Sequence, residues 1–543
     1  MIKRQNLRFL KSFIKKQYKA IIFVSILELV MVFTSISVPY FLGRMITSLE
    51  TNYATIESLI KNFIIVIGLY FIWDLSNTVI DIKFAEINKN IQNDIRSFCY
   101  NKILNSKISL IEDKSEGEII NKLLKDTEKL EQAFLNLFNL IVSTVQILAL
   151  IISMININAI ATEILIIFFV ILIIIQRIFS KKLEKGYYDY KDSEEELLKN
   201  LKKFISGFMN IKIFALESTC LNILNEKNKE NFKNCKLVNK VSSIYSNVSF
   251  FIISVFRVLS LLIGGLIYLI WRSITLGEIF SMYSYAIQLT TELRSIIKID
   301  IILKDVETSL DRIIKFINQF EVERPLKERN IIINTIESKN MKFDYKDNRI
   351  FNNLSFKLRK NDVVAIRGSN GSGKTSLMKL ICGFYEVDNL FFNEIAQKDL
   401  SEYEILRRIS YVPQNIYLFP DSILNNISCF GQAKEEEVYK VCKKLNIHNK
   451  ILGLSDGYNT MVDEQNLNLS GGEKQIICIA RALLKKSDIL ILDEINSALD
   501  DKMEENIIEN IKYYYKNKIV LLISHKDRIL EDCNITINLD DYK

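Results

Sequence analysis

The sequence lacks the cysteine patterns that mark metal sites and disulfide frameworks. Its eight cysteines include no C-x-x-C pair and no other metal-ligand spacing. This excludes a zinc-binding or disulfide-rich class, and we expect reduced cytoplasmic thiols. Also absent is a small-residue cleavage site after the first apolar run, so that run should stay in the mature protein. Histidine is scarce: besides His525 there is only His448, which has no motif around it and should be an ordinary structural or surface residue.

What the sequence does have is length and apolar residues. With 543 residues it is long enough for two or more domains. Hydrophobic residues make up 49% and charged residues 25%, which fit together only if the apolar residues are segregated. A net charge of +7 suits either a nucleic-acid-binding protein or a membrane protein with lysine-rich cytoplasmic loops, and the distribution decides between them.

That distribution predicts an α-helical membrane domain over residues 1–320. Residues 20–42 carry a single charge, Glu28, and are long enough to cross the roughly 30 Å hydrocarbon layer. Further spans are expected at 63–80, at two segments within 133–175 and at 249–271, with a weaker sixth at about 279–301. No nucleic-acid partner is expected, and the lipid bilayer is the natural one.

The charged segments between the spans predict cytoplasmic helices. Basic residues precede the first span, whereas the short loops near 50–57 and 156–163 are poor in them, so the N-terminus should be cytoplasmic. Residues 81–132 and 180–248 carry Lys and Glu at helical spacing and should continue the spans as helices. Their turns, at 109–114 and 207–217, are expected to contact the C-terminal domain, although each could be an ordinary solvated hairpin.

Charges inside the spans are functional candidates, because they are costly in a bilayer. Asp74 and Arg257 fall at similar depth and are hypothesised to pair, within or across subunits. Glu28, Glu292 and Arg294 are hypothesised to face a central aqueous cavity. The alternative is that some of these residues lie near an interface.

Residues 331–543 alternate short apolar runs with helical stretches, which predicts an α/β domain. Residues 368–375 fit the P-loop pattern G-x-x-x-x-G-K-[ST] between a strand and a helix. The glycines let backbone N–H groups surround a polyphosphate, Lys374 adds a charge for the β and γ phosphates, and Thr375 is an Mg²⁺ ligand. Alone, the pattern indicates nucleotide binding, and a plain glycine-rich turn is the alternative.

Two further segments follow in order. Residues 469–475 place Ser470 and two glycines at a helix start, a second anion site. A buried strand ends in Asp493 and Glu494, which can hold Mg²⁺ and act on an attacking water, although apolar strands ending in Asp-Glu are common. Two separate phosphate-binding helix starts suggest that two domains share one nucleotide.

These residues together resemble the ATP-binding cassette (ABC) family, in its exporter-type half-transporter form. The matching motifs are a Walker A at 368–375, a glutamine loop at 411–414, a signature at 469–475, a Walker B ending in Glu494, a D-loop at 497–500, a switch histidine at 525 and an aromatic loop at 343–345. Segments 117–126, 207–217, 275–278 and 309–312 match the exporter-type permease, so the resemblance covers nearly the whole chain.

The resemblance implies a role for each matching residue. Catalysis would fall to Glu494 as general base, His525 at the γ phosphate, and Gln414. Mg²⁺ would be held by Thr375, Gln414 and Asp493. ATP would be bound by Tyr345, Gly368, Ser369, Asn370, Gly371, Ser372, Gly373, Lys374, Thr375, Ser376, Ser470, Gly471, Gly472 and Asp500.

One cassette and six spans further imply a half-transporter that works as a dimer, in which Ser470 and Gly472 close on ATP held by the other subunit. A homodimer is favoured over a heterodimer.

The sequence departs from the family pattern at a few positions. Glu473 replaces the usual signature glutamine, and Asp463 and Asn466 replace glycines common upstream. The D-loop begins Glu-Ile-Asn-Ser, and the chain stops soon after His525. None of these changes removes a phosphate, metal or water ligand, so a hydrolytically competent site is expected.

The resulting hypothesis is an ATP-driven exporter of an amphipathic or hydrophobic substrate, such as a peptide, lipid or drug. It would be a multi-pass protein of the cell membrane, bacterial, with a cytoplasmic ATPase domain. An importer built on the same fold and an ATP-gated channel or sensor are the alternatives. The absence of a leading cysteine-peptidase domain argues against coupled leader cleavage.

Overall fold

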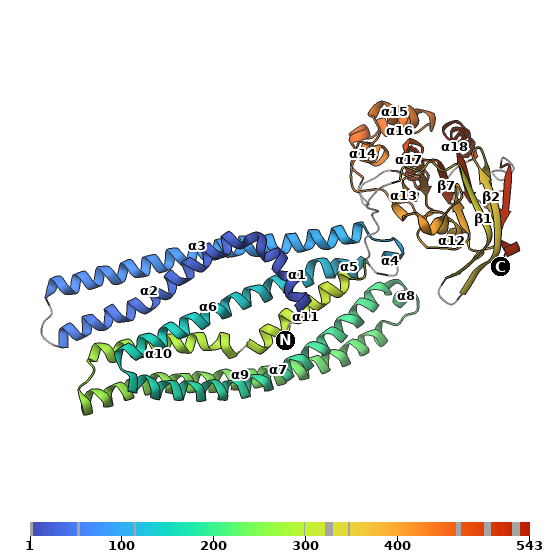
Figure 1. Cartoon of the computed structure of the whole chain (residues 1–543). Helices are drawn as coiled ribbons and strands as arrows, with labels where there is room; N and C mark the ends of the chain where they lie inside the picture. Colours follow the sequence, from blue (N-terminus) through green and yellow to red (C-terminus); the bar gives the residue numbers. More distant parts are fainter. Residues whose placement is uncertain are drawn as a thin grey trace. The chain divides into compact units, whose positions relative to one another are not determined.

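The computed structural model of the protein describes residues 4–50, 55–112, 114, 116–297, 299–320, 329–345, 348–462, 469–493, 501–523 and 533–542. It divides into two compact units (Figure 1). The helical unit comprises Met1–Tyr100 and Glu116–Ile317, and the second unit comprises Asn101–Ser115 and Asn318–Lys543. This division places the turn between the first two cytoplasmic helices with the C-terminal part of the chain.

The helical unit consists of long helices joined by short turns. They are α1 (Arg4–Ile14), α2 (Tyr18–Glu50), α3 (Ile56–Leu104), α5 (Glu116–Asn121), α6 (Thr127–Ile157), α7 (Ala159–Ser206), α8 (Phe208–Ile213), α9 (Glu217–Trp271), α10 (Leu276–Ile297) and α11 (Ile299–Ile317). A 3-10 turn (Lys15–Gln17) precedes α2, and a π-helical turn (Lys122–Asp126) precedes α6.

Five helices in the described part of the chain are long and apolar enough to cross a membrane. They lie at Arg8–Glu50, Ile56–Leu104, Glu116–Ile157, Ala159–Ile178 and Glu217–Trp271, and each contains one of the first five predicted spans. The predicted sixth span falls on α10, which is not among the five and carries Glu278, Glu292 and Arg294. α10 is packed against the other helices of this unit, where Met282, Tyr285 and Leu293 are buried among apolar residues, and its membrane span stays a prediction.

The predicted cytoplasmic extensions are helical. α9 has 55 residues and is therefore about 80 Å long at 1.5 Å per residue, far beyond the hydrocarbon thickness. α7 and α9 run side by side along their length (Figure 1). The turn between them, at residues 207–217, belongs to the helical unit, and its predicted contact with the ATPase domain stays a prediction.

α2 and α10 are joined through backbone groups. A Cβ at Gly277 would lie 2.7 Å from the carbonyl carbon of Gly43, so only glycine allows this approach. Pro39 lacks an N–H and leaves the carbonyl of Ser35 without its helical donor. The amide of Gln288 on α10 donates to that carbonyl at 2.9 Å. The proline is therefore tolerated inside α2 because α10 satisfies the exposed acceptor.

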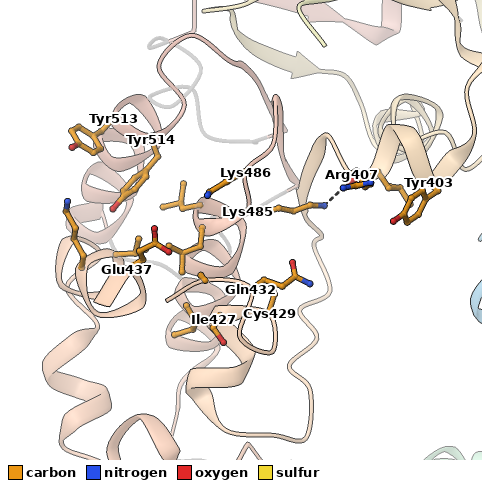
Figure 2. A pocket seen from close by; sticks show the side chains of 17 residues that line it. Tyr403, Arg407, Ile427, Cys429, Gln432, Glu437, Lys485, Lys486, Tyr513 and Tyr514 are labelled. Atoms are coloured by element: carbon orange, nitrogen blue, oxygen red, sulfur yellow. Dashed lines mark hydrogen bonds between the residues drawn. The ribbon is translucent and has the colours of Figure 1, made fainter. Parts of the chain in front are cut away.

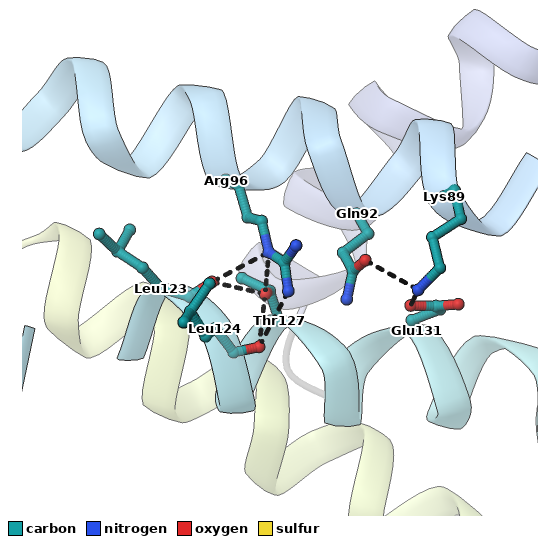
Figure 3. Close-up of polar contacts among 7 residues, drawn as sticks. All are labelled: Lys89, Gln92, Arg96, Leu123, Leu124, Thr127 and Glu131. Carbon is teal, nitrogen blue, oxygen red and sulfur yellow. Dashed lines mark hydrogen bonds and ion pairs between the residues drawn. The ribbon is translucent and has the colours of Figure 1, made fainter. Parts of the chain in front are cut away.

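A second polar contact fixes the start of α6. The guanidinium of Arg96 on α3 donates to the carbonyls of Leu123 and Leu124, at 3.2 and 3.3 Å, and to the hydroxyl of Thr127 at 3.0 Å (Figure 3). Both carbonyls belong to the π-helical turn, whose altered hydrogen-bond pattern leaves acceptors for a side chain to satisfy.

The hypothesised pair of Asp74 and Arg257 is wrong within one chain. Both guanidinium contacts of Arg257 go to the hydroxyl of Thr290 on α10, at 3.1 and 2.9 Å, and no ion pair joins Asp74 to Arg257 among the described residues. Asp74 is exposed on α3. Equal depth along two helices did not give the direction each residue faces, and pairing across subunits stays a prediction.

The second unit is the predicted α/β domain. An antiparallel sheet has the order β2-β1-β4-β5, and a parallel sheet has the order β6-β7-β8-β3-β9. The strands are β1 (Thr335–Tyr345), β2 (Asn348–Arg359), β3 (Val363–Arg367), β4 (Leu390–Phe392), β5 (Ile395–Ala396), β6 (Ile409–Val412), β7 (Ile489–Asp493), β8 (Ile519–Ile523) and β9 (Ile535–Asn538). β7 and β8 are buried at every position, as expected for the centre of a parallel sheet.

The helices of this unit are α4 (Ser109–Glu112), α12 (Lys374–Ile381), α13 (Glu402–Leu406), α14 (Ile423–Ser428), α15 (Glu435–Lys444), α16 (His448–Leu452), α17 (Gly471–Leu484) and α18 (Asp501–Tyr514). Two of them, α13 and α17, pack against β6 of the parallel sheet. Since parallel strands end at one edge of their sheet, β3 delivers the P-loop and β7 delivers Asp493 to the same edge. The boundaries 1–320 and 331–543 stay predictions.

Candidate ATP site

The P-loop joins β3 to α12 in a conformation that only glycines allow. Gly371 and Gly373 have φ angles of 81° and 94°, in the left-handed region. A Cβ at Gly373 would lie 2.6 Å from Ile350 Cγ2, whereas at Gly371 no atom lies within 4 Å. The loop is therefore packed against β2 on one side and open on the other.

The polar groups of the loop fit a polyphosphate. The ammonium of Lys374 is buried and donates to the carbonyls of Gly368 and Ser369, at 2.8 and 3.2 Å, so its charge is held inside the loop. Ser372 Oγ is buried and has no hydrogen-bond partner in the described part of the chain. A buried hydroxyl without a partner is costly, and a phosphate oxygen would satisfy it.

The C-terminal segment anchors the loop from outside. Asp540 accepts hydrogen bonds from the backbone N–H and the hydroxyl of Ser369, both at 2.7 Å. Ser369 was expected to bind ATP, but here its donors are directed to Asp540. Nothing in the sequence around Asp540 indicated this contact, because 171 positions separate the two residues.

Asp493, the predicted metal ligand, ends β7 and is buried. Tyr411 on the neighbouring strand β6 donates its hydroxyl to Asp493 Oδ2 at 3.1 Å. Burial, followed by the negative charge of Asp493, raises the pKa of Tyr411, so the phenol keeps its proton and donates it in this hydrogen bond. Gln414 lies two residues after the end of β6, which places it at the same edge of the sheet.

The signature residues open α17 through a capping box. Ser470 Oγ accepts from the N–H of Glu473 at 3.3 Å, and Glu473 Oε2 accepts from the N–H of Ser470 at 2.7 Å. The other oxygen of Glu473 pairs with Lys450 at 3.4 Å. Glu473, which departs from the family pattern, therefore stabilises the start of this helix, and Gly472 is buried beneath it.

The predicted adenine-stacking residue, Tyr345, touches a second tyrosine. The rings of Tyr345 and Tyr385 meet edge to face, with centroids 5.7 Å apart. Tyr385 donates its hydroxyl to Glu112 Oε2 at 2.6 Å, and Lys379 on α12 pairs with Glu112 Oε1 at 2.8 Å. Burial, the hydrogen bond to Glu112 and the nearby Tyr345 hydroxyl raise the pKa of Tyr385.

Glu112 belongs to α4, the turn predicted to contact the ATPase domain, and the contact exists within this unit. Lys107 pairs with Glu386 at 2.6 Å, and the N–H of Ile108 donates to the carboxylate of Glu402 at 3.1 Å. The sequence located this turn but named none of its partners.

Three predicted residues, Glu494, Asp500 and His525, lie outside the described residues, and their roles stay predictions. The other histidine, His448, lies 2.8 Å from the hydroxyl of Tyr458 through Nδ1, which is the structural position expected for it. Side-chain contacts of Ser470 in the described chain stay within its own helix, and none reaches the P-loop.

Two family models match the chain in succession. The ABC transporter transmembrane region matches residues 21–293, and the ABC transporter model matches residues 351–497. The chain belongs to the ABC transporter family. As an exporter-type ABC transporter it is a membrane protein that binds ATP and couples its hydrolysis to transport.

Named relatives and a solved structure agree with this assignment. The chain is 30% identical to the multidrug resistance-like ATP-binding protein MdlA of Buchnera aphidicola, over 82% of this chain and 79% of that protein. It is 24% identical to the ATP-dependent lipid A-core flippase of Pseudoalteromonas translucida, over 84% and 80%. A bacterial Atm1-family ABC exporter with ATP bound has the same fold, with a TM-score of 0.80 at 19% identity, covering 96% and 94% of the two chains.

Proposed function

We propose that this ABC transporter is an exporter of amphipathic or hydrophobic molecules that works as a homodimer in a bacterial cell membrane. Relatives named for multidrug resistance and lipid A flipping support a cargo with a large apolar part. The half-transporter organisation supports a dimer, because a single chain supplies one P-loop and one signature helix.

The observation that carries the proposal is the P-loop, with the Lys374 ammonium held inside it and a buried Ser372 hydroxyl that has no hydrogen-bond partner among the described residues. Those groups suit the phosphates of ATP. Thr375, Gln414 and Asp493 would hold Mg²⁺, which would neutralise phosphate charge when bound. Ser376 and the N–H groups of the loop would complete the phosphate contacts at the start of α12.

Hydrolysis would then depend on residues of both subunits. Glu494 would take a proton from the attacking water, and His525 would keep the water and the γ phosphate aligned. Ser470, Gly471 and Gly472 of one subunit would close on the ATP bound by the other, and Asp500 would lie at the same boundary. Closure would bias the membrane helices toward an outward-open arrangement, and hydrolysis would reset them.

The experiment replaces the proposed base. Glu494→Gln should abolish ATP turnover in proteoliposomes while keeping a stable ATP-bound dimer, measured by size exclusion with ATP. Glu509→Gln, an exposed carboxylate on α18, is the matched control and should keep full activity. Wild-type turnover in Glu494→Gln would refute the assignment, and inward-only movement of a labelled amphiphile in oriented vesicles would refute export.

A further inference from the structure

A pocket of about 670 Å³ lies in the ATPase unit and contains none of the predicted ATP-site residues. It is formed where α13, α14, α17 and α18 end, with one face of α15 closing it. α17 begins at the signature serine and has 14 residues, so its end is about 20 Å away from the signature. The pocket is therefore separate from the nucleotide site.

The floor of the pocket is apolar and its edge is aromatic. Ile427, Val441 and Leu483 are buried beneath it. Figure 2 shows Tyr513 and Tyr514 together on one side, with Lys485 and Lys486 between them and Arg407. The volume falls within the range of about 300 to 1,000 Å³ typical of small-molecule sites.

The charge on the lining is strongly positive. Among the described residues, the lining has one carboxylate, Glu437, and four basic side chains, Arg407, Lys440, Lys485 and Lys486. Lys485 has a structural role, since its ammonium donates to the carbonyls of Leu406 and Ile409 at the end of α13. No such hydrogen bonds to backbone carbonyls within the described residues explain why Lys440 and Lys486 are in the lining.

The side-chain ammonium groups of Lys440 and Lys486 make no ion pair or hydrogen bond in the described part of the chain. Lys440 lies in the middle of α15, away from the helix end whose dipole a lysine would complement. Uncompensated positive charge above an apolar concave surface attracts an anion more strongly than the same charge on a convex surface.

The loop beside the pocket is held in an unusual conformation. Cys429, Phe430 and Gly431 have φ angles of 52°, 57° and 86°, so two residues other than glycine follow one another in the left-handed region. Such backbone persists where surrounding contacts enforce it, and it is frequent at ligand sites. It places Cys429 in the pocket lining, half-buried.

We propose that this pocket binds a small organic anion in which a phosphate or carboxylate is joined to a flat apolar body. The anionic group lies near Lys440 and Lys486, and the apolar body lies on the floor beside the tyrosine rings. The lining shares no residue with the P-loop, so this site is separate from the one that holds ATP.

The test uses Cys429 as a reporter in the full-length protein in lipid nanodiscs without nucleotide. Each cysteine is alkylated with N-ethylmaleimide and followed separately by peptide mass spectrometry. The probe is 1-naphthyl phosphate. At a concentration of about ten times its Kd, the fraction of unoccupied sites falls about tenfold, so the alkylation rate of Cys429 should fall about tenfold as well. Cys220 and Cys235, partly exposed on α9, should keep their rates.

Variants and simpler probes then separate the outcomes. Lys440→Glu with Lys486→Glu should remove the protection, whereas Lys443→Glu, exposed on the same helix and outside the lining, should keep it. Inorganic phosphate and uncharged 1-naphthol should each protect far less. Equal protection by 1-naphthol would overturn the anion requirement.

The site itself would be overturned if 1-naphthyl phosphate did not slow alkylation of Cys429, or if it slowed alkylation of every cysteine equally. It would also be overturned if Lys443→Glu lost the protection of Cys429 to the same extent as the double variant. Cys442 and Cys478 are buried and serve as folding controls. If these two cysteines become reactive in the double Glu variant, the double variant Lys440→Gln with Lys486→Gln is used in its place. Unchanged protection of Cys429 in the double Gln variant would contradict the proposal.

Discussion

The contact between Glu112 and Tyr385 should hold the α4 turn on the ATPase domain. Glu112 accepts a hydrogen bond of 2.6 Å from the Tyr385 hydroxyl and pairs with Lys379 at 2.8 Å. Hydrogen bonds to a charged group contribute about 1.5 to 3 kcal/mol, and a partly exposed ion pair contributes about 0.2 to 1 kcal/mol. Glu112→Ala, which removes both, should therefore weaken docking of α4 by about 2 kcal/mol or more.

Amide hydrogen exchange measures this loss directly. The N–H of Ile108 in the turn is hydrogen-bonded to the carboxylate of Glu402, so its exchange reports opening of the docked turn. A loss of about 2 kcal/mol corresponds to about 30-fold faster exchange of a peptide spanning this turn. Lys398→Ala, which removes an exposed ion pair with Asp388 elsewhere on the domain, should leave that exchange unchanged.

A double-mutant cycle assigns the energy to the pair. Tyr385→Phe keeps the ring that packs on Tyr345 and removes only the hydroxyl, and Glu112→Gln removes the charge. The coupling energy between the two changes should be about 1 to 3 kcal/mol. Additive effects, with a coupling below about 0.5 kcal/mol, would show that the short contact does not hold the turn and that the reasoning is wrong.

Three further outcomes follow from contacts elsewhere in the molecule. Gly277→Ala would drive a Cβ into the backbone of α2 and should lower the free energy of unfolding by about 1 to 3 kcal/mol or more, measured as a lower melting temperature. The control Gly265→Ala should leave the melting temperature unchanged, because a Cβ there has no described neighbour within 4 Å. Arg96→Ala should remove the guanidinium that joins α3 to two carbonyls of the π-helical turn, leaving them the donors of Thr127, and should cost about 1 to 3 kcal/mol and speed amide exchange there; unchanged exchange would argue against this role. Tyr411→Phe removes the donor to Asp493 and should change the Mg²⁺ dependence of ATP turnover by up to about tenfold while ATP binding persists, so an unchanged Mg²⁺ titration would count against it.

The motifs could be found from sequence because each occupies one short segment with a fixed chemical requirement. The P-loop needs glycines at particular positions, and the structure has Gly371 and Gly373 in left-handed conformations there. Glu473 departs from the family pattern, yet the rule that joins Ser to Glu three residues later predicts its capping box.

Contacts between distant segments were not predictable in the same way. Glu112 and Tyr385 are 273 positions apart, and neither lies in a motif. Tyr411 is closer to being predictable, since it opens the glutamine-loop motif on a strand parallel to the one that ends in Asp493. Asp74 and Arg257 were matched by depth alone, but Arg257 points toward Thr290 because the rotation of a helix is set by its packing.

The junction of α2 with α10 limits how the membrane helices can move. Most helix interfaces adjust through rotation of side chains, but at Gly43 and Gly277 the two backbones meet directly and no rotamer can absorb a displacement. Gln288 adds a bond to the carbonyl that Pro39 leaves open, a few turns away on the same interface. During a transport cycle α2 and α10 should therefore move together as one rigid body, and relative motion between helices should occur at other interfaces of the bundle.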